Sequence, residues 1–209
     1  MSETTHPGPW RIALRQCGGN DRGSQLVEFD VSLPLLVVFV VGIFDFSSAF
    51  TLKQKLTAAA RDGARAAVSL PANDLGSAFA PGAAPFSVNS TLQVVDNYLT
   101  AEKLNDCGLS TATPTQAGQT WTYTEAGNGC PGAGVTVIIN RGYVFPRAGT
   151  QLPVNCGGQS PSSGTNVVGT CVNIQYAYQW RFDRVISLLG TSNSLPTSLT
   201  TTAVAMNEY

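Results

Sequence analysis

The chain has 209 residues, a formal net charge of −1 and charged side chains at only 12% of its positions, whereas 43% of its residues are hydrophobic. Because its lysines and arginines form no sizeable patch, we expect no nucleic-acid partner. The only histidine, His6, lies in a polar N-terminal segment that we expect to be removed, so the remaining chain would have no imidazole for acid–base catalysis. We therefore expect neither an enzyme nor a cofactor.

Residues 1–23 form a polar leader, and the chain turns largely apolar at Ser24. The leader carries three arginines, Arg11, Arg15 and Arg22. Charge followed by an apolar run is typical of an exported segment. A secretory signal peptide would carry a small-residue cleavage site after its apolar run, whereas here the run continues into the pattern of a polar helix. The pattern therefore disfavours ordinary signal-peptide removal.

Residues 31–44 are almost entirely apolar, and their flanks bring the span to the length that crosses a bilayer as a helix, about 20 residues. We expect one transmembrane helix over about residues 30–50. A buried core helix of a soluble domain is the alternative, because the uninterrupted apolar run is short. Three acids also lie inside or beside it: Glu28, Asp30 and Asp45.

Beyond the membrane span, small and apolar residues recur at helical spacing from Leu52 to Ala67, and charged residues fill the other faces. Small side chains on such a stripe let another element approach closely. The long helix should run from Ser24 to Val68 and stop before Pro71. We therefore expect residues 24–70 to form one long N-terminal helix.

Residues 71–86 are rich in Pro, Gly, Ala and Ser, which is typical of a linker or an ordered loop. A second helix should follow, capped by Ser87 or Asn89 and ended by Cys107 and Gly108. Its inward-facing residues should be Leu92, Val95, Leu99 and Leu104.

Residues 87–209 form the predicted head, and strands dominate its later part. Period-two patterns predict strands at 120–125, 135–145, 172–182 and 199–206. Segments 108–119 and 146–170 are typical of long surface loops, and 182–189 fits a short amphipathic turn of helix. Helices first and strands later indicate an α+β head in which a small antiparallel sheet packs on the long helix.

Six aromatic residues alternate along these strands: Trp121, Tyr123, Tyr143, Tyr176, Tyr178 and Trp180. A period of two places one row of each strand toward the long helix and the other row outward. Core packing and a dedicated binding surface are both open for these aromatic residues.

Of the five cysteines, Cys17 lies in the leader and four lie in the head. An even number in the exported part fits an oxidising compartment. On loop-closure grounds we prefer one bridge between Cys107 and Cys130 and another between Cys156 and Cys171, among three possible pairings. A metal site is not expected, because the chain has no CxxC motif and its one histidine is in the leader.

The acids of the head show no spacing that predicts a catalytic pair. They include Asp96, Glu102, Asp106, Glu125 and Asp183. Nor does any glycine-rich stretch carry the lysine of a phosphate-binding loop. These absences reinforce the expectation of a non-catalytic protein.

The segment 23–29, GSQLVEF, resembles the prepilin-peptidase site of the Flp class of type IV pilins. Three blocks follow in order, LPLL, GIFDF and LTAAARDGAR, and with it they resemble the N-terminal signature of the TadE-like family, minor pilins or pseudopilins of tight-adherence systems. The final AVAMNEY resembles the short strand that closes many TadE-like chains. One residue departs from the pattern, because Asp30 stands where these proteins more usually have a small or apolar residue.

The resemblance implies cleavage by a prepilin peptidase between Gly23 and Ser24. A glycine at the scissile bond lets the backbone approach the catalytic groups without a side-chain clash. In related pilins the acid of the Glu-Phe pair, here Glu28 with Phe29, is thought to bind the new amine of a neighbouring subunit. A carboxylate in lipid is costly when unpaired, so it implies such a partner. The alternative is that Glu28 only caps the first helical turn.

Asp45 is a second candidate assembly residue, between Phe44 and Phe46. It could pair with a cation on a neighbouring subunit or on a machinery protein. It could equally lie at the outer membrane interface among lipid headgroups, because Ser47 and Ser48 follow directly. The sequence leaves both interpretations open.

The resemblance therefore implies a pilin-like fold and a role in assembling or priming a tight-adherence type IV pilus. Its expected partners are the prepilin peptidase, the pilus assembly platform, other minor or major pilins and membrane lipid. The protein should cross the bacterial inner membrane once, with the arginine-rich leader in the cytoplasm. Lys53 and Lys55 beyond the span weaken that charge rule. We therefore rely on the four cysteines of the head, which indicate that the head is periplasmic or extracellular. The alternative is a membrane-anchored binding or adhesion module that never enters a filament.

Overall fold

The structure is a computed structural model, and it describes residues 21–76, 79–145, 155–157, 167–181 and 196–207. The chain divides into two compact units, Met1–Val41 and Gly42–Tyr209. Helix α1, Asp21–Ser69, contributes residues to both. The leader up to residue 20, the turn expected at 182–189 and most of the loop expected at 146–170 lie outside the described residues.

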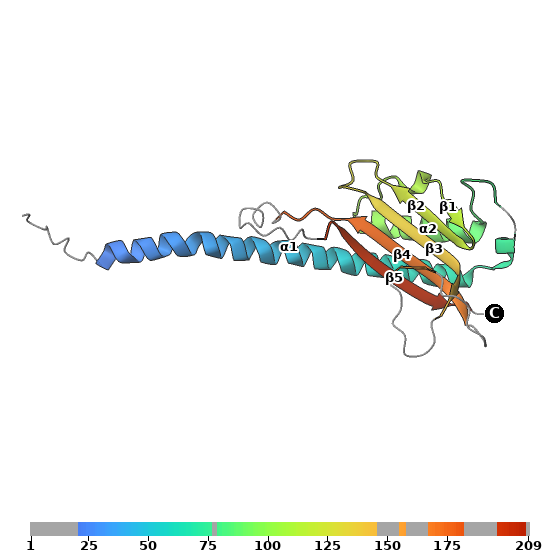
Figure 1. Cartoon of the computed structure of the whole chain (residues 1–209), viewed down its shortest axis with the longest axis horizontal. Coiled ribbons are helices and arrows are strands. Elements are labelled where there is room, and N and C mark those ends of the chain that lie inside the picture. Colours follow the sequence, from blue (N-terminus) through green and yellow to red (C-terminus); the bar gives the residue numbers. More distant parts are fainter. Residues whose placement is uncertain (1–20, 77–78, 146–154, 158–166, 182–195, 208–209) are drawn as a thin grey trace, which may run out of the picture. The chain divides into compact units, whose positions relative to one another are not determined.

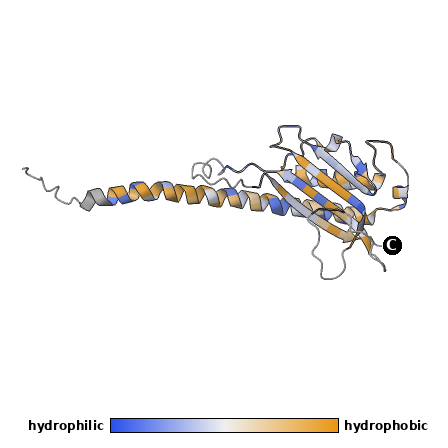
Figure 2. Ribbon diagram, viewed as in Figure 1, coloured by the Kyte–Doolittle hydropathy of each residue, from blue (hydrophilic) through white to orange (hydrophobic). Residues whose placement is uncertain are grey.

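In the first unit, α1 carries its apolar side chains on the outside. Apart from the half-buried Val38, the large apolar residues of 25–41 are exposed, and Figure 2 shows the hydrophobic colouring along this stretch. A helix that is apolar all round fits a buried position or a membrane span. Pro34 lies inside α1, where neighbouring residues still form a continuous helix.

The second unit is an α+β head with a five-stranded antiparallel sheet whose strands neighbour one another in chain order, β1-β2-β3-β4-β5 (Figure 1). The strands are β1 Thr115–Ala117, β2 Thr120–Glu125, β3 Val135–Val144, β4 Val168–Ala177 and β5 Ser198–Met206. A second helix, α2, spans Phe86–Ala101, and two short 3₁₀ helices lie at Asn73–Gly76 and Leu109–Thr111. The predicted fold class is confirmed.

The core of the head lies between one face of the sheet and the two helices. Leu56, Ala60 and Ala64 of α1 are buried there against Val95 and Leu99 of α2. The sheet contributes Trp121, Tyr123, Val137, Ile139, Val172 and Ile174 to the same cluster. Alternate strand residues face the helices, so the aromatic pair on β2 is core packing rather than an exposed surface.

Gly63 sets how closely α1 and α2 approach. A Cβ at this position would lie 2.7 Å from the Cγ2 of Val95, closer than side chains tolerate. The missing side chain therefore lets the two helices pack at short range.

The predicted end of α2, at Cys107 and Gly108, is too late, because the prediction relied on a glycine as the stop signal. The helix ends at Ala101, and Lys103 takes the left-handed conformation with φ 58°. The amide of Leu104 donates to the carbonyl of Leu99, and the amide of Lys103 donates to that of Thr100. This is a Schellman motif built on a lysine instead of the usual glycine.

Two segments expected to be loops contain regular structure. Residues 108–119 hold β1 and the 3₁₀ helix in which Leu109 is fully buried. Strand β4 begins at Val168 and ends at Ala177, four residues earlier at its start than predicted, because Gly169 and Val168 pair with Tyr143 and Val144. Polar composition concealed both pairings, since a strand whose outer row is Thr, Ser or Gly has the residue content of a loop.

Candidate assembly site on helix α1

Within the described part of the chain, one helix is long and apolar enough to cross a membrane. It is Gln25–Ser69, with a mean hydropathy of 2.3 in its 18-residue window and none of that window buried. The exposed side chains include Leu26, Phe29, Leu35, Phe39, Ile43, Phe46 and Phe50. Water would solvate such a surface poorly, so the helix has the surface of a membrane anchor.

The expected cleavage bond lies inside helical backbone. Helix α1 begins at Asp21, three residues before the predicted start, so the Gly23–Ser24 bond falls in its first turn. Amide groups of a first helical turn have no partner within the helix. Helix ends also fray readily, so this bond lies in the part of α1 that opens at least cost.

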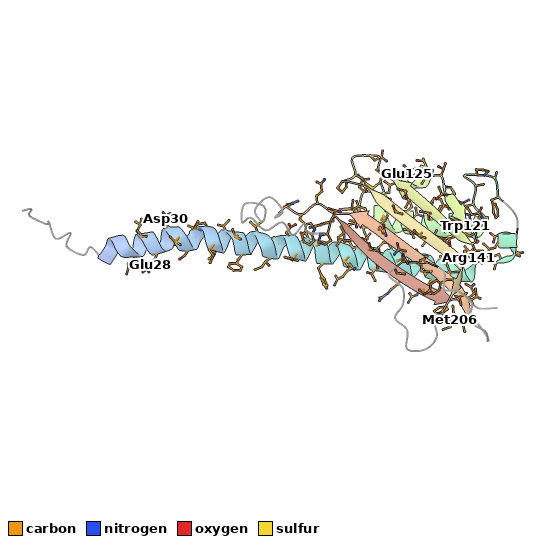
Figure 3. The ribbon with its side chains drawn as sticks, viewed as in Figure 1. Glu28, Asp30, Trp121, Glu125, Arg141 and Met206 are labelled. Carbon is orange, nitrogen blue, oxygen red and sulfur yellow. A yellow bond between two sulfur atoms is a disulfide. The ribbon has the colours of Figure 1, made fainter. Side chains whose placement is uncertain are left out.

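Glu28 and Phe29 are both exposed, and Phe29 keeps 65% of its surface. Among the described residues, the Glu28 carboxylate has no hydrogen bond or ion pair; only its backbone carbonyl is bound, by the Ser32 hydroxyl at 2.6 Å. Figure 3 shows Glu28 and Asp30 on opposite sides of α1. The helix dipole favours an acid within the first turn of a helix. Because α1 begins at Asp21, Glu28 of the uncleaved chain lies beyond that turn.

Asp45 contacts its own head. Its side chain is only 4% exposed, and the Tyr178 hydroxyl donates to its Oδ1 at 3.0 Å and to its carbonyl at 3.2 Å. Burial raises the pKa of Tyr178 to about 12, and the hydrogen bond to Asp45 and its charge add to the effect. Tyr178 therefore remains a hydrogen-bond donor at physiological pH. Neither interpretation from the sequence had foreseen a partner within the same chain.

Arg141 anchors the C-terminal end of α1, and sequence reasoning missed it. A bulge in β3 between Asn140 and Tyr143 turns its side chain toward α1, where it is 1% exposed (Figure 3). The guanidinium donates to the carbonyls of Ala67, Leu70 and Pro71. Helix α1 has no basic residue in its own last turn, so Arg141 supplies the positive charge that its dipole favours there.

Burial lowers the pKa of Arg141, and the nearby charge of Asp74 opposes that shift. Asp74 also binds the start of α2, where its carboxylate accepts from the amide of Ser87 at 2.8 Å and from its hydroxyl at 3.1 Å. Within the described part of the predicted linker, Asp74 is therefore held against the start of α2. A lone arginine inside the apolar run VTVIINRGYV was the available signal for this anchor.

Two lysines of α1 hold the helix on the head from the other end. The Lys53 ammonium donates to the carbonyl of Thr200 on β5 at 2.7 Å. Lys55 forms an ion pair with Glu102 at 3.1 Å and donates to its carbonyl at 3.0 Å. Both cations therefore make contacts within the head.

The structure joins Cys107 to Cys130 and Cys156 to Cys171, the pairing that loop closure favours. The second bridge lies in a small apolar cluster with Tyr143, separate from the main core. No group of three or more metal-binding side chains occurs among the residues that the structure describes.

Two acids of the head, Asp96 and Asp106, interact with each other. Burial, the charge of Asp106 and a side-chain hydrogen bond between the two residues all raise the pKa of Asp96. The Schellman turn after α2 reverses the chain and returns Asp106 toward the helix that carries Asp96. Spacing along the sequence could not show this contact, because the turn residue is a lysine.

A family model described as TadE-like protein matches residues 23–65. No curated protein and no solved structure matches the chain. The matched segment contains Gly23, Glu28, Phe29 and Asp45, and it ends within the part of α1 that packs on the head. The resemblance seen in the sequence is confirmed over residues 23–65, which match the TadE-like family model.

Proposed function

We propose that the protein is a minor pilin or pseudopilin of a tight-adherence (Flp) type IV pilus, processed by a prepilin peptidase between Gly23 and Ser24. The TadE-like match over residues 23–65 carries the proposal, since it covers the expected cleavage site and the candidate assembly residues. The role is one of assembly and not of catalysis. Its partners would be the peptidase, the assembly platform and other pilins.

The exposed, unpaired acid of α1 supports this role. Glu28 lies among exposed apolar side chains and has no partner for its carboxylate in the described residues. An ionised carboxylate in lipid is unfavourable unless a cation or donor meets it. Cleavage after Gly23 frees an amine at Ser24, and the Ser24 amine of a neighbouring subunit would supply such a cation.

The head supports an exported location. Its four described cysteines form two bridges, which persist in oxidising compartments and are rare in the cytosol. The leader's arginines favour the cytoplasm. In the proposed topology the leader is cytoplasmic, α1 crosses the inner membrane once and the head is periplasmic until the subunit is extracted into a filament.

The experiment that tests the assembly role compares two acids of the same helix. Glu28→Gln should be processed normally yet be lost from sheared pili, because the neutral side chain cannot pair with the new amine. Asp30→Asn is the matched control, since it removes an equally exposed charge two residues away and should leave incorporation unchanged.

Equal incorporation of Glu28→Gln and the wild type would contradict the pairing. Absence of both from pili, with the protein stable in the membrane, would favour an anchored binding or adhesion module.

A further inference from the structure

The exposed apolar surface of α1 continues past the point where the head begins to cover the helix. In the second unit, Phe46 and Phe50 are 62% and 65% exposed, whereas Asp45 and Ala49 are only 4% and 5% exposed. One side of this stretch is therefore buried by the head and the other side is bare and apolar. From residue 45 to residue 50 the helix rises about 8 Å.

The part of the head that covers this stretch is the segment 178–181, directly after β4. Tyr178 binds Asp45 through its hydroxyl, and the ring of Trp180 lies 5.3 Å from the ring of Phe46. Tyr178 and Trp180 also contact each other edge to face, with ring centroids 4.9 Å apart. These contacts fix the segment at the level of residues 45 and 46 along the helix axis.

The two observations together place the segment 178–181 at a membrane surface. If exposed apolar side chains of α1 lie in lipid as far as Phe50, a segment bound at the level of Asp45 cannot stand clear of the lipid headgroups. Its composition suits that depth, because Trp and Tyr are enriched at membrane interfaces and a long cationic side chain reaches the headgroups.

A cleft opens beside this segment. It has a volume of about 470 Å³ and is lined by Ser48 of α1, by Pro131 and by residues 176–181. Arg181 is exposed and supplies the one positive charge among the described lining residues, and no acid is among them. Gln179 is exposed as well. A guanidinium beside neutral donors is suited to bind a phosphate group.

We propose that this cleft holds the phosphate headgroup of a phospholipid from the leaflet on the head's side of the membrane, with Arg181 on the phosphate and Trp180 at the headgroup level. The site fixes how deep α1 sits before extraction. The inference rests on the membrane stage of the proposed function, and it assigns a lipid contact to a segment outside the TadE-like match.

Depth-dependent quenching tests the location. The full chain with Trp10→Phe is reconstituted in vesicles of phosphatidylethanolamine and phosphatidylglycerol whose acyl chains carry bromine at different depths. Trp121 has no exposed surface, so Trp180 should provide the quenchable emission, and Trp180→Phe should abolish it. We expect the strongest quenching of Trp180 from bromines nearest the headgroup.

Two reporters in the Trp180→Phe background calibrate the scale. Phe39→Trp, at a position 63% exposed in the first unit, should be quenched most by bromines at the bilayer centre. Phe86→Trp, at a position 71% exposed in the head, should respond to acrylamide in water and not to brominated lipid. Trp180 behaving like Phe86→Trp while Phe39→Trp reports insertion would overturn the inference alone. Failure of Phe39→Trp to respond to any brominated lipid would overturn both the inference and the membrane stage.

The charge is tested by lipid retention. After release from the same vesicles into mild detergent, native mass spectrometry should show phospholipid bound to the wild type and about tenfold less on Arg181→Gln, the change expected for one charge-assisted hydrogen bond. Lys103→Gln, which removes another exposed cation of the head, should retain lipid as the wild type does. Equal loss in the two variants would contradict the headgroup site. Inorganic phosphate added to lipid-free protein should not bind, since the proposed ligand is the lipid.

Discussion

The two units of the chain differ in whether their characteristic residues make contacts within the fold. In the first, Leu26, Phe29 and Glu28 are exposed, yet a family model matches the segment that contains them. The second unit holds Arg141, Gly63 and the core, whose positions are fixed by contacts within the fold, and most of this unit lies beyond the matched segment, which ends at residue 65. Under the proposed function, partners outside the chain would constrain the N-terminal helix, whereas internal packing constrains the head. Changes in the head should therefore alter its stability and leave processing intact.

The largest expected effect is that of Arg141→Ala. The substitution leaves carbonyls at the end of α1 without a donor and opens a cavity in the head, so the free energy of unfolding should fall by about 3 kcal/mol. Chemical denaturation of the detergent-solubilised full chain, followed by near-UV circular dichroism, measures the change. Arg61→Ala, at an exposed position of the same helix, should cost no more than about 0.5 kcal/mol. Equal effects would show that Arg141 does not anchor α1.

Gly63→Ala should have an intermediate effect. The added methyl group would press on Val95, and overpacking of this kind costs about 1 to 3 kcal/mol. Gly42→Ala is the matched helical control, because nothing lies within 4 Å of a Cβ at that position. The same denaturation experiment separates the two. A Gly63→Ala variant as stable as Gly42→Ala would mean that the two helices do not pack so closely.

The smallest effect concerns Asp96, and it depends on pH. Its pKa is raised above 3.8 in the folded head, so the ionised form opposes folding at neutral pH. Acidification from neutral pH through the raised pKa should stabilise the head, and the gain should level off near the unfolded value. Asp96→Asn should be slightly more stable than the wild type at neutral pH. Because asparagine does not titrate, the difference between the two proteins should disappear as the wild type is stabilised by acid. Thermal unfolding at several pH values measures it, and a stability of the wild type that falls steadily with acid would contradict the pKa shift.

The elements predicted well from the sequence are those whose hydrophobic pattern by itself indicates which residues are buried. The apolar run of α1 and the alternating pattern of β2, which the structure begins and ends at the predicted Thr120 and Glu125, follow from periodicity alone. The fold class followed from their order. Short strands with polar outer rows, such as β1, gave no such signal.

The candidate site divides in the same way. Gly23, Ser24, Glu28 and Phe29 could be named from a local motif, because their expected partners lie outside the chain. The contact of Asp45 with Tyr178 joins positions 133 residues apart, and that of Arg141 with Leu70 joins positions 71 apart. Neither could be predicted, since no local pattern encodes which distant side chain a folded head brings to the helix.

The central claim is that the N-terminal unit is a peptidase substrate, and N-terminal sequencing of the protein recovered from membranes tests it most directly. The wild type in a host with its prepilin peptidase should begin at Ser24. Loss of the peptidase and the Gly23→Ala variant should each leave the leader attached, while Arg141→Ala should still be cut. A wild-type chain that keeps Met1 and the leader in the presence of the peptidase would contradict the account.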